Sequence, residues 1–496
     1  MEFLIFHIFG KEGSPTEAML SIGLKYKQAL LIILLIGAAI TVYLPAMKGG
    51  FIWDDEAHIV NNANLKSLKG LWQMWSNPRS IPGRQVYPLT FTTFWIEYQI
   101  WGDHPLGYRI TNIILHCLNA LLLWRILLML RIPGAWVAAC VFLLHPIEVE
   151  SVAWISERKN LLSGFWYFTA FFFFLKFMEK DRGLFYASSL FSYFLALLAK
   201  TMTCSLPVAL WISVWWQKGR LARKDFNLGL PFLLIGMPVG LFTAWLERYH
   251  VGAMGAAWDL SFWQRLLIAS RAWWFYMGKL FWPTKLTFIY PRWEISVGSL
   301  SQWGFVLAAF IAVLACWLLR KKIGRGPISG LLFYTVTIFP ALGFFNIYPM
   351  RYSFVADHFQ YLAGLGIIVT TVGMLSYLTE EPRYRKYAAS FSIVVITILA
   401  SLTWRQGFIY KDSQTLWENT VKKNPSAWMA YNNLGIVYYN QGKVEGAIKA
   451  FRRAILLNPG DPDPHNNLGI AYGKMGLYQD AYREIKQARM LKAKQK

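Results

Sequence analysis

Three consecutive carboxylic acids, Asp54, Asp55 and Glu56, are the residues of this chain best placed to do chemistry. They lie in the stretch GFIWDDEAHIVNN, just after the first apolar segment long enough to cross a bilayer, at about residues 28–47. Ionisable side chains beside a membrane usually have a function, because placing them there costs free energy. Such carboxylates can accept a proton from a substrate or bind a cation. The alternative is a solvated loop that serves only as a topological marker.

Two later segments contain groups that can act with these carboxylates. They read HPIEVESVAWISERKN, from residue 145, and YPMRYSFVADHFQYLAGLG, from residue 348. Their candidate residues are Glu150, Arg158, Lys159, Arg351, Asp357 and His358. The topology given below puts both segments outside the cytoplasm, where cations run against the positive-inside rule. Such cations indicate an anionic partner, and beside a bilayer a lipid-linked phosphate is the obvious one. An exposed or ion-paired cation is the alternative.

The composition indicates a polytopic membrane protein. Of 496 residues, 55% are hydrophobic and 17% aromatic, and 50 Lys and Arg against 27 Asp and Glu give a net charge of +23. The cations cluster in short loops between apolar runs, so the positive-inside rule explains them without a nucleic-acid partner. The four cysteines have no paired spacing that would predict a disulfide or a metal site. No permitted Asn-x-Ser/Thr acceptor occurs, which favours a bacterial membrane over a secretory one.

Hydropathy predicts about eleven membrane spans after a lead of residues 1–24. They lie near residues 28–47, 106–130, 136–144, 161–178, 184–198, 204–216, 228–246, 303–319, 328–345, 361–378 and 388–404. The cation clusters at 320–325 and 383–386 are both cytoplasmic only if the segment 263–282 stays outside, as an interfacial or re-entrant helix. A second interfacial helix is expected over residues 65–75. His116 and His145 are expected to pack or to form hydrogen bonds.

After residue 404 the composition becomes polar and an internal repeat of 34 residues begins. The repeated positions are Leu434, Gly435, Tyr438, Gly442, Ala447 and Ala454, which recur as Leu468, Gly469, Tyr472, Gly476, Ala481 and Ala488. A period of 34 with small residues at helix contacts is typical of tetratricopeptide repeats. We therefore expect a membrane domain over residues 25–404 and an extracytoplasmic solenoid over 405–496. The solenoid binds an extended peptide or a partner, or it packs on the membrane domain.

These features together resemble the TMTC-type and bacterial relatives of the protein O-mannosyltransferases. The resemblance rests on the F-x-W-D-D-x-x-x-I-x-x-N pattern of residues 51–62, the HPIEVESVAWISERKN and ADHFQYL blocks and the repeats, and it covers residues 50 to 490. It implies an all-α protein, with a GT-C-like helical membrane bundle followed by a tetratricopeptide solenoid. It also implies a glycosyltransferase that uses a polyprenyl-phosphate sugar. Similar bacterial sequences have arginine where this chain has His358.

The chemistry implied by this resemblance suits the residues. Transfer from a lipid phosphate to a hydroxyl needs a base for the acceptor proton and positive charge for the leaving phosphate. We assign the general base to Asp54 or Asp55. The donor phosphate is assigned to Arg158, Lys159, Arg351 and His358. Positioning of the acceptor or of a cation is assigned to Glu56, Glu150 and Asp357. Asp54 and Asp55 can also share a divalent Mg²⁺ or Mn²⁺, although the resemblance favours no obligatory metal, and this question stays open.

The predicted function is inverting transfer of mannose or a similar hexose to an extracytoplasmic acceptor, with protein Ser/Thr favoured. The partners are the polyprenyl-phosphate sugar, membrane lipid and an acceptor polypeptide that the repeats bind, with no nucleic acid. The expected location is a bacterial inner membrane, with the active site and the repeats on the periplasmic side. The alternatives are a lipid or surface-glycan acceptor and a non-enzymatic scaffold. A transporter would more often place its charges within facing spans than at span ends.

Overall fold

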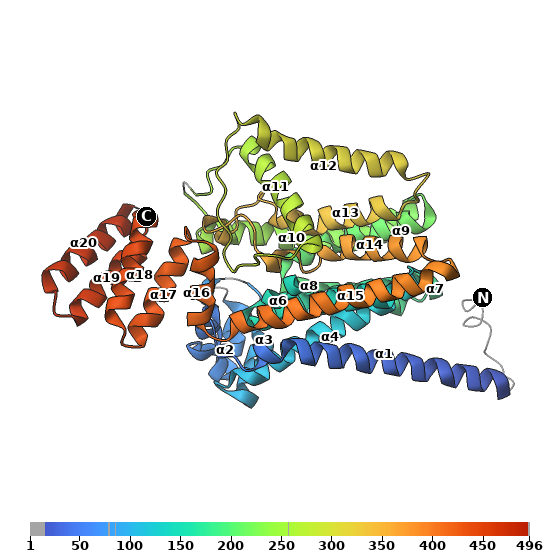
Figure 1. Cartoon of the computed structure of the whole chain (residues 1–496), viewed down its shortest axis with the longest axis horizontal. Helices are drawn as coiled ribbons and strands as arrows, with labels where there is room; N and C mark the ends of the chain where they lie inside the picture. Colours follow the sequence, from blue (N-terminus) through green and yellow to red (C-terminus); the bar gives the residue numbers. More distant parts are fainter. Residues whose placement is uncertain (1–14, 78–79, 85, 256, 495–496) are drawn as a thin grey trace.

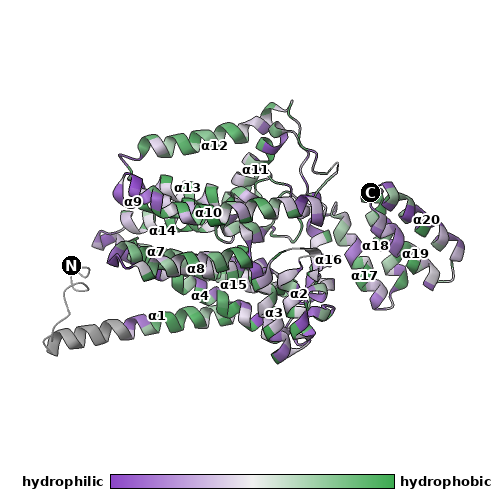
Figure 2. Ribbon diagram, turned by 180° about the vertical axis from the view of Figure 1, so that it is seen from behind, coloured by the Kyte–Doolittle hydropathy of each residue, from purple (hydrophilic) through white to green (hydrophobic). Residues whose placement is uncertain are grey.

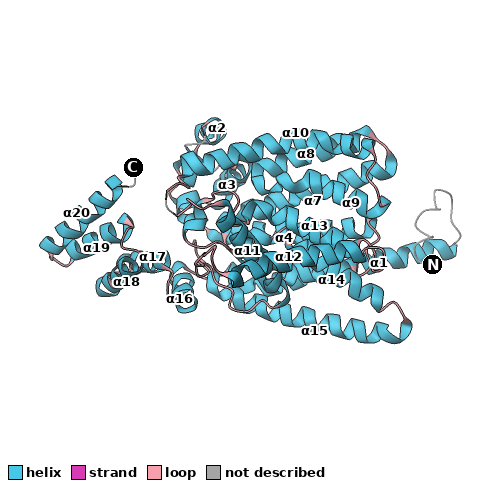
Figure 3. Cartoon of the chain, turned by 90° about the horizontal axis from the view of Figure 1, so that it is seen from above, coloured by secondary structure: helices cyan, strands magenta, loops and turns pink. Residues whose placement is uncertain are grey.

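The computed structural model describes residues 15–494 except 78–79, 85 and 256. Within these ranges the chain consists of helices and loops without a β-strand, so the predicted all-α fold class is confirmed (Figure 3). The apolar stretch at residues 3–9, expected to belong to a lead before the first span, lies outside the described residues.

Six helical segments are long and apolar enough to cross a membrane. They are Tyr26–Met47, Pro105–Met129, Ile155–Lys180, Arg223–Val251, Leu300–Leu319 and Pro382–Tyr410. Their helices are α1 (Pro15–Met47), α4 (Pro105–Met129), α7 (Arg158–Lys180), α10 (Arg223–Leu246), α12 (Leu300–Leu319) and α15 (Pro382–Gly407). Figure 2 shows hydrophobic residues along most of α12, and hydrophilic residues at the ends of the bundle and over parts of the C-terminal helices. This distribution is compatible with a membrane protein.

The eleven spans expected from hydropathy are not confirmed in the described part of the chain. One broken pair, α5 (Ala135–Leu144) with Pro146–Ala153, is bent by 48° and raises the count to seven at most. The remaining apolar helices are shorter: α8 (Gly183–Ala199), α9 (Leu206–Lys218), α13 (Gly326–Ile338) and α14 (Gly364–Leu378). A helix of 13 residues such as α9 is only about 20 Å long, against ~30 Å of hydrocarbon. Polar turns end these helices early, and those turns build the site described below.

The segment expected to stay outside the cytoplasm as an interfacial or re-entrant helix is α11 (Phe262–Phe281). It is not among the six candidate spans. Its cations are satisfied within the protein: Arg265 donates to the backbone oxygen of Gly343 at 2.8 Å, and the Arg271 guanidinium lies 4.5 Å from the centre of the Trp293 ring. The expected interfacial helix near residues 65–75 forms as α2 (Leu68–Ser76), which exposes Leu68 and Trp72 on one face.

The C-terminal part of the chain is a solenoid of five helices that follows α15 (Figure 1). The helices are α16 (Ser413–Lys423), α17 (Trp428–Asn440), α18 (Val444–Leu457), α19 (Pro462–Lys474) and α20 (Tyr478–Lys494). Glycines of the repeat permit close helix contact, since a Cβ on Gly435 would lie 2.4 Å from the Phe451 ring. The predicted repeat is therefore confirmed as antiparallel helix pairs.

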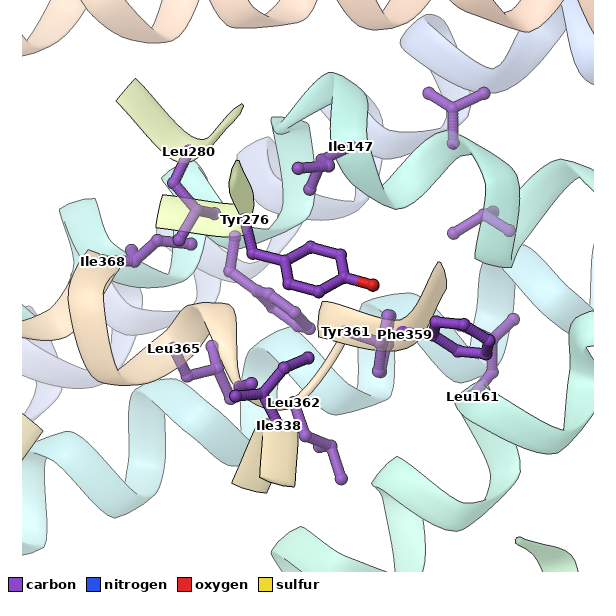
Figure 4. Close-up of a cluster of buried hydrophobic side chains, with 14 of the residues drawn as sticks. Ile147, Leu161, Tyr276, Leu280, Ile338, Phe359, Tyr361, Leu362, Leu365 and Ile368 are labelled. Carbon is purple, nitrogen blue, oxygen red and sulfur yellow. The ribbon is translucent and has the colours of Figure 1, made fainter. Parts of the chain in front are cut away.

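A continuous buried core holds the turn that follows residue 356 against the long helices. Figure 4 shows Tyr361 and Phe359 among apolar side chains that include Ile147, Leu161 and Leu365. The Tyr361 hydroxyl lies 2.9 Å from His116 Nδ1, and His145 Nε2 lies 3.0 Å from the backbone oxygen of Leu280. Both histidines therefore have the hydrogen-bonding role expected of them, and the core fixes the position of the neighbouring His358.

Candidate active site

A cavity of about 770 Å³ lies at the end of the bundle that faces the solenoid. Its walls come from the loop after α1, the start of α7, the α8–α9 connection, α10, residues 339–359 and Met429 of α17. Its ionisable lining residues include Asp54, His58, Glu150, Glu157, Lys159, Lys200, Glu247 and His358. The structure thus brings together four of the residues singled out in the sequence: Asp54, Glu150, Lys159 and His358.

The backbone at Trp53 turns the chain so that Asp54 lines the cavity. Trp53 has a φ of 45°, in the left-handed region that a large aromatic residue rarely adopts. Its ring stacks on Trp154 with centroids 5.3 Å apart and makes edge contacts with Phe288 and Trp417. Such packing can hold a backbone strain of order 1–3 kcal/mol. The order Trp-Asp-Asp therefore has a structural reason, because the tryptophan anchors the turn.

Asp55 has a different role from its neighbour. It is fully buried and does not line the cavity. Its Oδ1 accepts hydrogen bonds from the Ser156 backbone N–H at 2.8 Å and the Ser156 hydroxyl at 2.6 Å, and its Oδ2 accepts from the Ile52 N–H at 3.1 Å. The carboxylate therefore ties the loop after α1 to the turn before α7. Of the two aspartates expected to include the base, only Asp54 lines the cavity.

The two aspartates have raised pKa values, mainly because both are removed from water. Burial raises the pKa of Asp54 to about 7, with Lys159 opposing and Asp55 adding to the shift. Burial raises the pKa of Asp55 to about 6, against the hydrogen bonds from Ser156 and Ile52. A general base is most effective when its pKa lies near the working pH. Asp54 meets this condition at neutral pH.

Glu157 holds two lysines at the cavity wall. Its Oε1 lies 2.9 Å from Lys159 Nζ, and its Oε2 lies 3.3 Å from Lys200 Nζ. Asn160 completes the arrangement. Its Oδ1 accepts a hydrogen bond from Lys200 at 2.6 Å. Its Nδ2 donates to the Glu157 carboxylate at 2.8 Å and to the His358 backbone oxygen at 2.9 Å. At this part of the wall two ammonium groups share one carboxylate, so their remaining N–H donors are suited to binding an anion.

Two histidines line the same cavity as neutral groups. His358 Nδ1 lies 2.8 Å from Glu150 Oε1, and His58 Nδ1 lies 3.0 Å from the Ser156 hydroxyl. Burial lowers the pKa of each imidazole to about 3. His358, expected at the donor phosphate, is therefore uncharged at neutral pH and acts there through hydrogen bonds, while the positive charge comes from the lysines.

Arg158, expected at the donor phosphate, points away from the cavity. Its fully buried guanidinium pairs with Glu97 at 2.7 Å, donates to the Tyr108 backbone oxygen at 2.7 Å and contacts Asn112 Oδ1. The group therefore joins α3 (Pro88–Trp101), α4 and α7. Arg158 and Lys159 are adjacent, but consecutive helical residues point in different directions, so only the lysine reaches the cavity.

Replacement of Arg158 by Met is expected to destabilise the fold rather than weaken donor binding. The substitution leaves the buried Glu97 carboxylate without its partner, and removing one member of a buried pair costs about 3–5 kcal/mol. Thermal unfolding of the purified protein in detergent measures the loss. Lys176→Met, which removes a partly exposed pair with Glu179 on the same helix, is the control. Unchanged stability together with a raised KM for the donor would contradict this role.

The other expected site residues also lie elsewhere. Arg351 pairs with Asp461 of the solenoid at 2.6 Å and lies over the rings of Tyr348 and Trp428, so it ties α19 to the membrane domain. Asp357 is buried and accepts from the Tyr290 hydroxyl at 2.9 Å. Glu56 is exposed and does not line the cavity. Among the residues that the structure describes, no three His, Cys, Asp or Glu side chains are grouped so as to hold a metal ion.

Sequence reasoning assigned no role to four ionisable lining residues: Lys200, Glu157, His58 and Glu247. A signal for Lys200 was present, because the expected topology puts it outside the cytoplasm after the fifth apolar segment, where a lysine runs against the positive-inside rule. His58 lies four residues after Asp54 in the first outer loop. Glu157 lies in the HPIEVESVAWISERKN block, but its role depends on contacts that no spacing reveals.

The chain is similar in sequence to several known proteins. A protein O-mannosyl-transferase of Caenorhabditis elegans is 24% identical over 469 residues, which are 90% of this chain and 65% of the relative. Mus musculus TMTC3 is 21% identical over 489 residues (88% of this chain, 52% of the relative), and Homo sapiens TMTC1 is 25% identical over 496 residues (86% and 55%). The relatives of this chain are protein O-mannosyl-transferases of the TMTC type.

These O-mannosyl-transferases are longer than the chain, which spans about half to two thirds of their length. A family described as a TPR repeat matches residues 437–476, from the end of α17 to the turn before α20. The similarity to the O-mannosyl-transferases extends over most of the chain.

Proposed function

We propose that this chain is an inverting glycosyltransferase that moves a hexose, mannose or a similar sugar, from a polyprenyl-phosphate donor to a hydroxyl group outside the cytoplasm. The observation that carries the proposal is the single cavity in which the Asp54 carboxylate, with a pKa near 7, lies with Lys159 and Lys200. A base and a pair of cations are the groups that such a transfer needs. The names of the relatives support the same class of reaction.

In the proposed reaction, Asp54 takes the proton of the acceptor hydroxyl. The acceptor oxygen forms a bond to the anomeric carbon of the sugar while the bond from that carbon to the phosphate oxygen breaks. Lys159 and Lys200 stabilise the charge that collects on the leaving phosphate. Glu157 and Asn160 position both ammonium groups. One displacement at the anomeric carbon inverts its configuration.

The shape of the cavity suits a lipid-linked donor. One face of α10 lines it with Leu233, Gly236, Met237, Gly240 and Leu241, which follow the spacing of a single helix side. Met237 and Leu241 remain more than half exposed, at 58% and 56%, so the cavity opens toward the surface that lipid would cover. A prenyl tail can therefore lie along α10 while the phosphate reaches the lysines.

The acceptor side of the proposal rests on the solenoid. Met429 of α17 lines the cavity, as do Tyr348 and Tyr352 of the segment that Arg351 joins to Asp461. A polypeptide held by the repeats would thus have its Ser and Thr hydroxyls near Asp54. In this proposal residues 25–404 form the catalytic membrane domain and residues 405–496 form the domain that guides the acceptor. The active site and the repeats lie on the periplasmic side of a bacterial inner membrane.

Transfer assays in liposomes test this function. Purified protein is supplied with radiolabelled mannosyl polyprenyl phosphate and with a Ser/Thr-rich polypeptide, a glycolipid or a surface glycan as acceptor, with Mg²⁺ or with EDTA. We expect labelled polypeptide whose anomeric configuration, read by NMR, is opposite to that of the donor. Label only in lipid or glycan would assign the alternative acceptors, and no transfer to any of them would overturn the proposal.

The pH dependence of the proposed reaction follows from two pKa values. Asp54 must be deprotonated, and since burial raises its pKa to about 7, kcat/KM should fall tenfold for each pH unit below about 7. Lys200 must be protonated, and since burial lowers its pKa to about 8, kcat/KM should fall again above about 8. Initial rates from pH 5 to 10 measure both limbs. The guanidinium of a Lys200→Arg variant keeps its charge at high pH, so kcat/KM of this variant should stay high to a higher pH. If its kcat/KM fell at the same pH as that of the unmodified protein, another group would be responsible for the fall.

A further inference from the structure

A second cavity, of about 650 Å³, lies within the bundle and has no part in the proposed reaction. It is bounded by one side of α14 over its whole length, by the middle of α7, by α9, and by the last turns of α4 and the first turns of α13. These helix ends lie at the end of the bundle opposite the solenoid (Figure 1). The cavity shares no lining residue with the cavity around Asp54. We call it the apolar cavity.

The lining of the apolar cavity is almost entirely hydrocarbon. Representative lining residues are Leu127, Phe171, Ile212, Phe333 and Val369. Cavities lined in this way exclude water and bind apolar molecules. Tyr377 and Leu378 at the end of α14 line it while remaining 67% exposed, so the opening lies at the bundle surface. In a bilayer this opening faces acyl chains.

Polar groups in the lining are few and specifically placed. The Ser329 hydroxyl, on a residue only 8% exposed, has no hydrogen-bond partner in the described structure. Lys322 lines the cavity and is exposed, so it lies at the mouth. It makes no ion pair with a described residue, and none of the described lining residues is acidic. A cation at the mouth of an apolar cavity complements a molecule with an anionic head and an apolar tail.

We propose that the apolar cavity binds an anionic phospholipid, with an acyl chain inside the bundle and the headgroup phosphate on Lys322. Basic pockets between membrane helices on the cytoplasmic side bind anionic headgroups in this manner. The neighbouring cation Arg320 adds to the attraction, while Arg325 is engaged with the backbone oxygen of Trp216 at 3.0 Å. The Ser329 hydroxyl is available to the ester oxygens of the chain. Bound lipid would fill the space between α9, α13 and α14.

Lipid retention tests this proposal without any assay of transfer. The full chain is exchanged into detergent with equal amounts of phosphatidylglycerol and phosphatidylcholine that carry the same acyl chains, and native mass spectrometry counts the lipids retained. We expect selective retention of phosphatidylglycerol. Lys322→Glu should lower that retention about tenfold, because it reverses the charge at the headgroup. Ile212→Trp, which fills the cavity, should lower the retention of both lipids.

Lys321→Glu is the matched control, since Lys321 is exposed on the same turn but does not line the cavity. Inorganic phosphate at millimolar concentration should not displace the lipid, because the acyl chain contributes to binding. Equal retention of the two lipids by the unmodified chain, or equal loss in Lys321→Glu and Lys322→Glu, would overturn the proposal. So would unchanged retention in Ile212→Trp, which does not depend on charge.

Discussion

Asp54→Asn should lower kcat for sugar transfer by about 10²–10⁴-fold and leave the protein folded. The amide is nearly isosteric with the carboxylate but cannot accept the acceptor proton. Asp54 lies at a cavity wall rather than in the bonded core, so its substitution removes no bond comparable to those of Asp55. Transfer rates with saturating donor and acceptor, together with the melting temperature in detergent, measure the two effects.

Asp55→Asn provides the matched comparison for this first prediction. In the asparagine variant the amide oxygen can still accept the hydrogen bonds from Ser156. The amide NH₂ group then replaces the oxygen that accepted from the Ile52 N–H, so two buried donors face each other. The cost of such a buried unsatisfied group is about 1–3 kcal/mol. We therefore expect reduced stability and retained transfer. The lower pH limb of activity should move toward lower pH, because the Asp55 charge no longer adds to the raised pKa of Asp54. If Asp55→Asn proved inactive but fully stable while Asp54→Asn stayed active, the roles of the two residues would be exchanged.

Lys200→Met should lower kcat/KM for the donor by about 10²-fold, because the variant loses one of two cations at the leaving phosphate. Lys159 remains paired with Glu157, so the buried carboxylate keeps a counterion and the fold is maintained. The effect should be seen with saturating acceptor as a raised donor KM and a lowered kcat, and the upper pH limb should disappear.

Lys176→Met controls for the loss of a lysine from α7, since Lys176 lies 17 residues beyond Lys159, about 25 Å along the helix. It should retain normal kinetics. A Lys200→Met variant with unchanged donor KM and an unchanged upper pH limb would remove the phosphate role from Lys200. The positive charge would then have to come from Lys159 alone.

Parts of the candidate site could be predicted from the sequence, because the signals were local. The Trp-Asp-Asp stretch and Lys159 stood out by residue type and by their place after or before an apolar run. The 34-residue period likewise specified the solenoid, since each repeat buries its small residues against its neighbour. Hydropathy was less informative for the spans, because it measures composition and not where a polar turn stops a helix.

It follows from the sequence alone that the chain is helical and apolar, that its C-terminal part contains tetratricopeptide repeats, and that a row of acids follows its first long apolar segment. Which of those acids faces a cavity depends on the folded arrangement, since Asp54 and Asp55 are alike in type and differ in the direction of their side chains. The folded arrangement also pairs Arg158 with Glu97 and brings Lys200 beside Lys159 at the Glu157 carboxylate. These outcomes depend on contacts between residues 43 to 101 positions apart, which a spacing pattern does not encode.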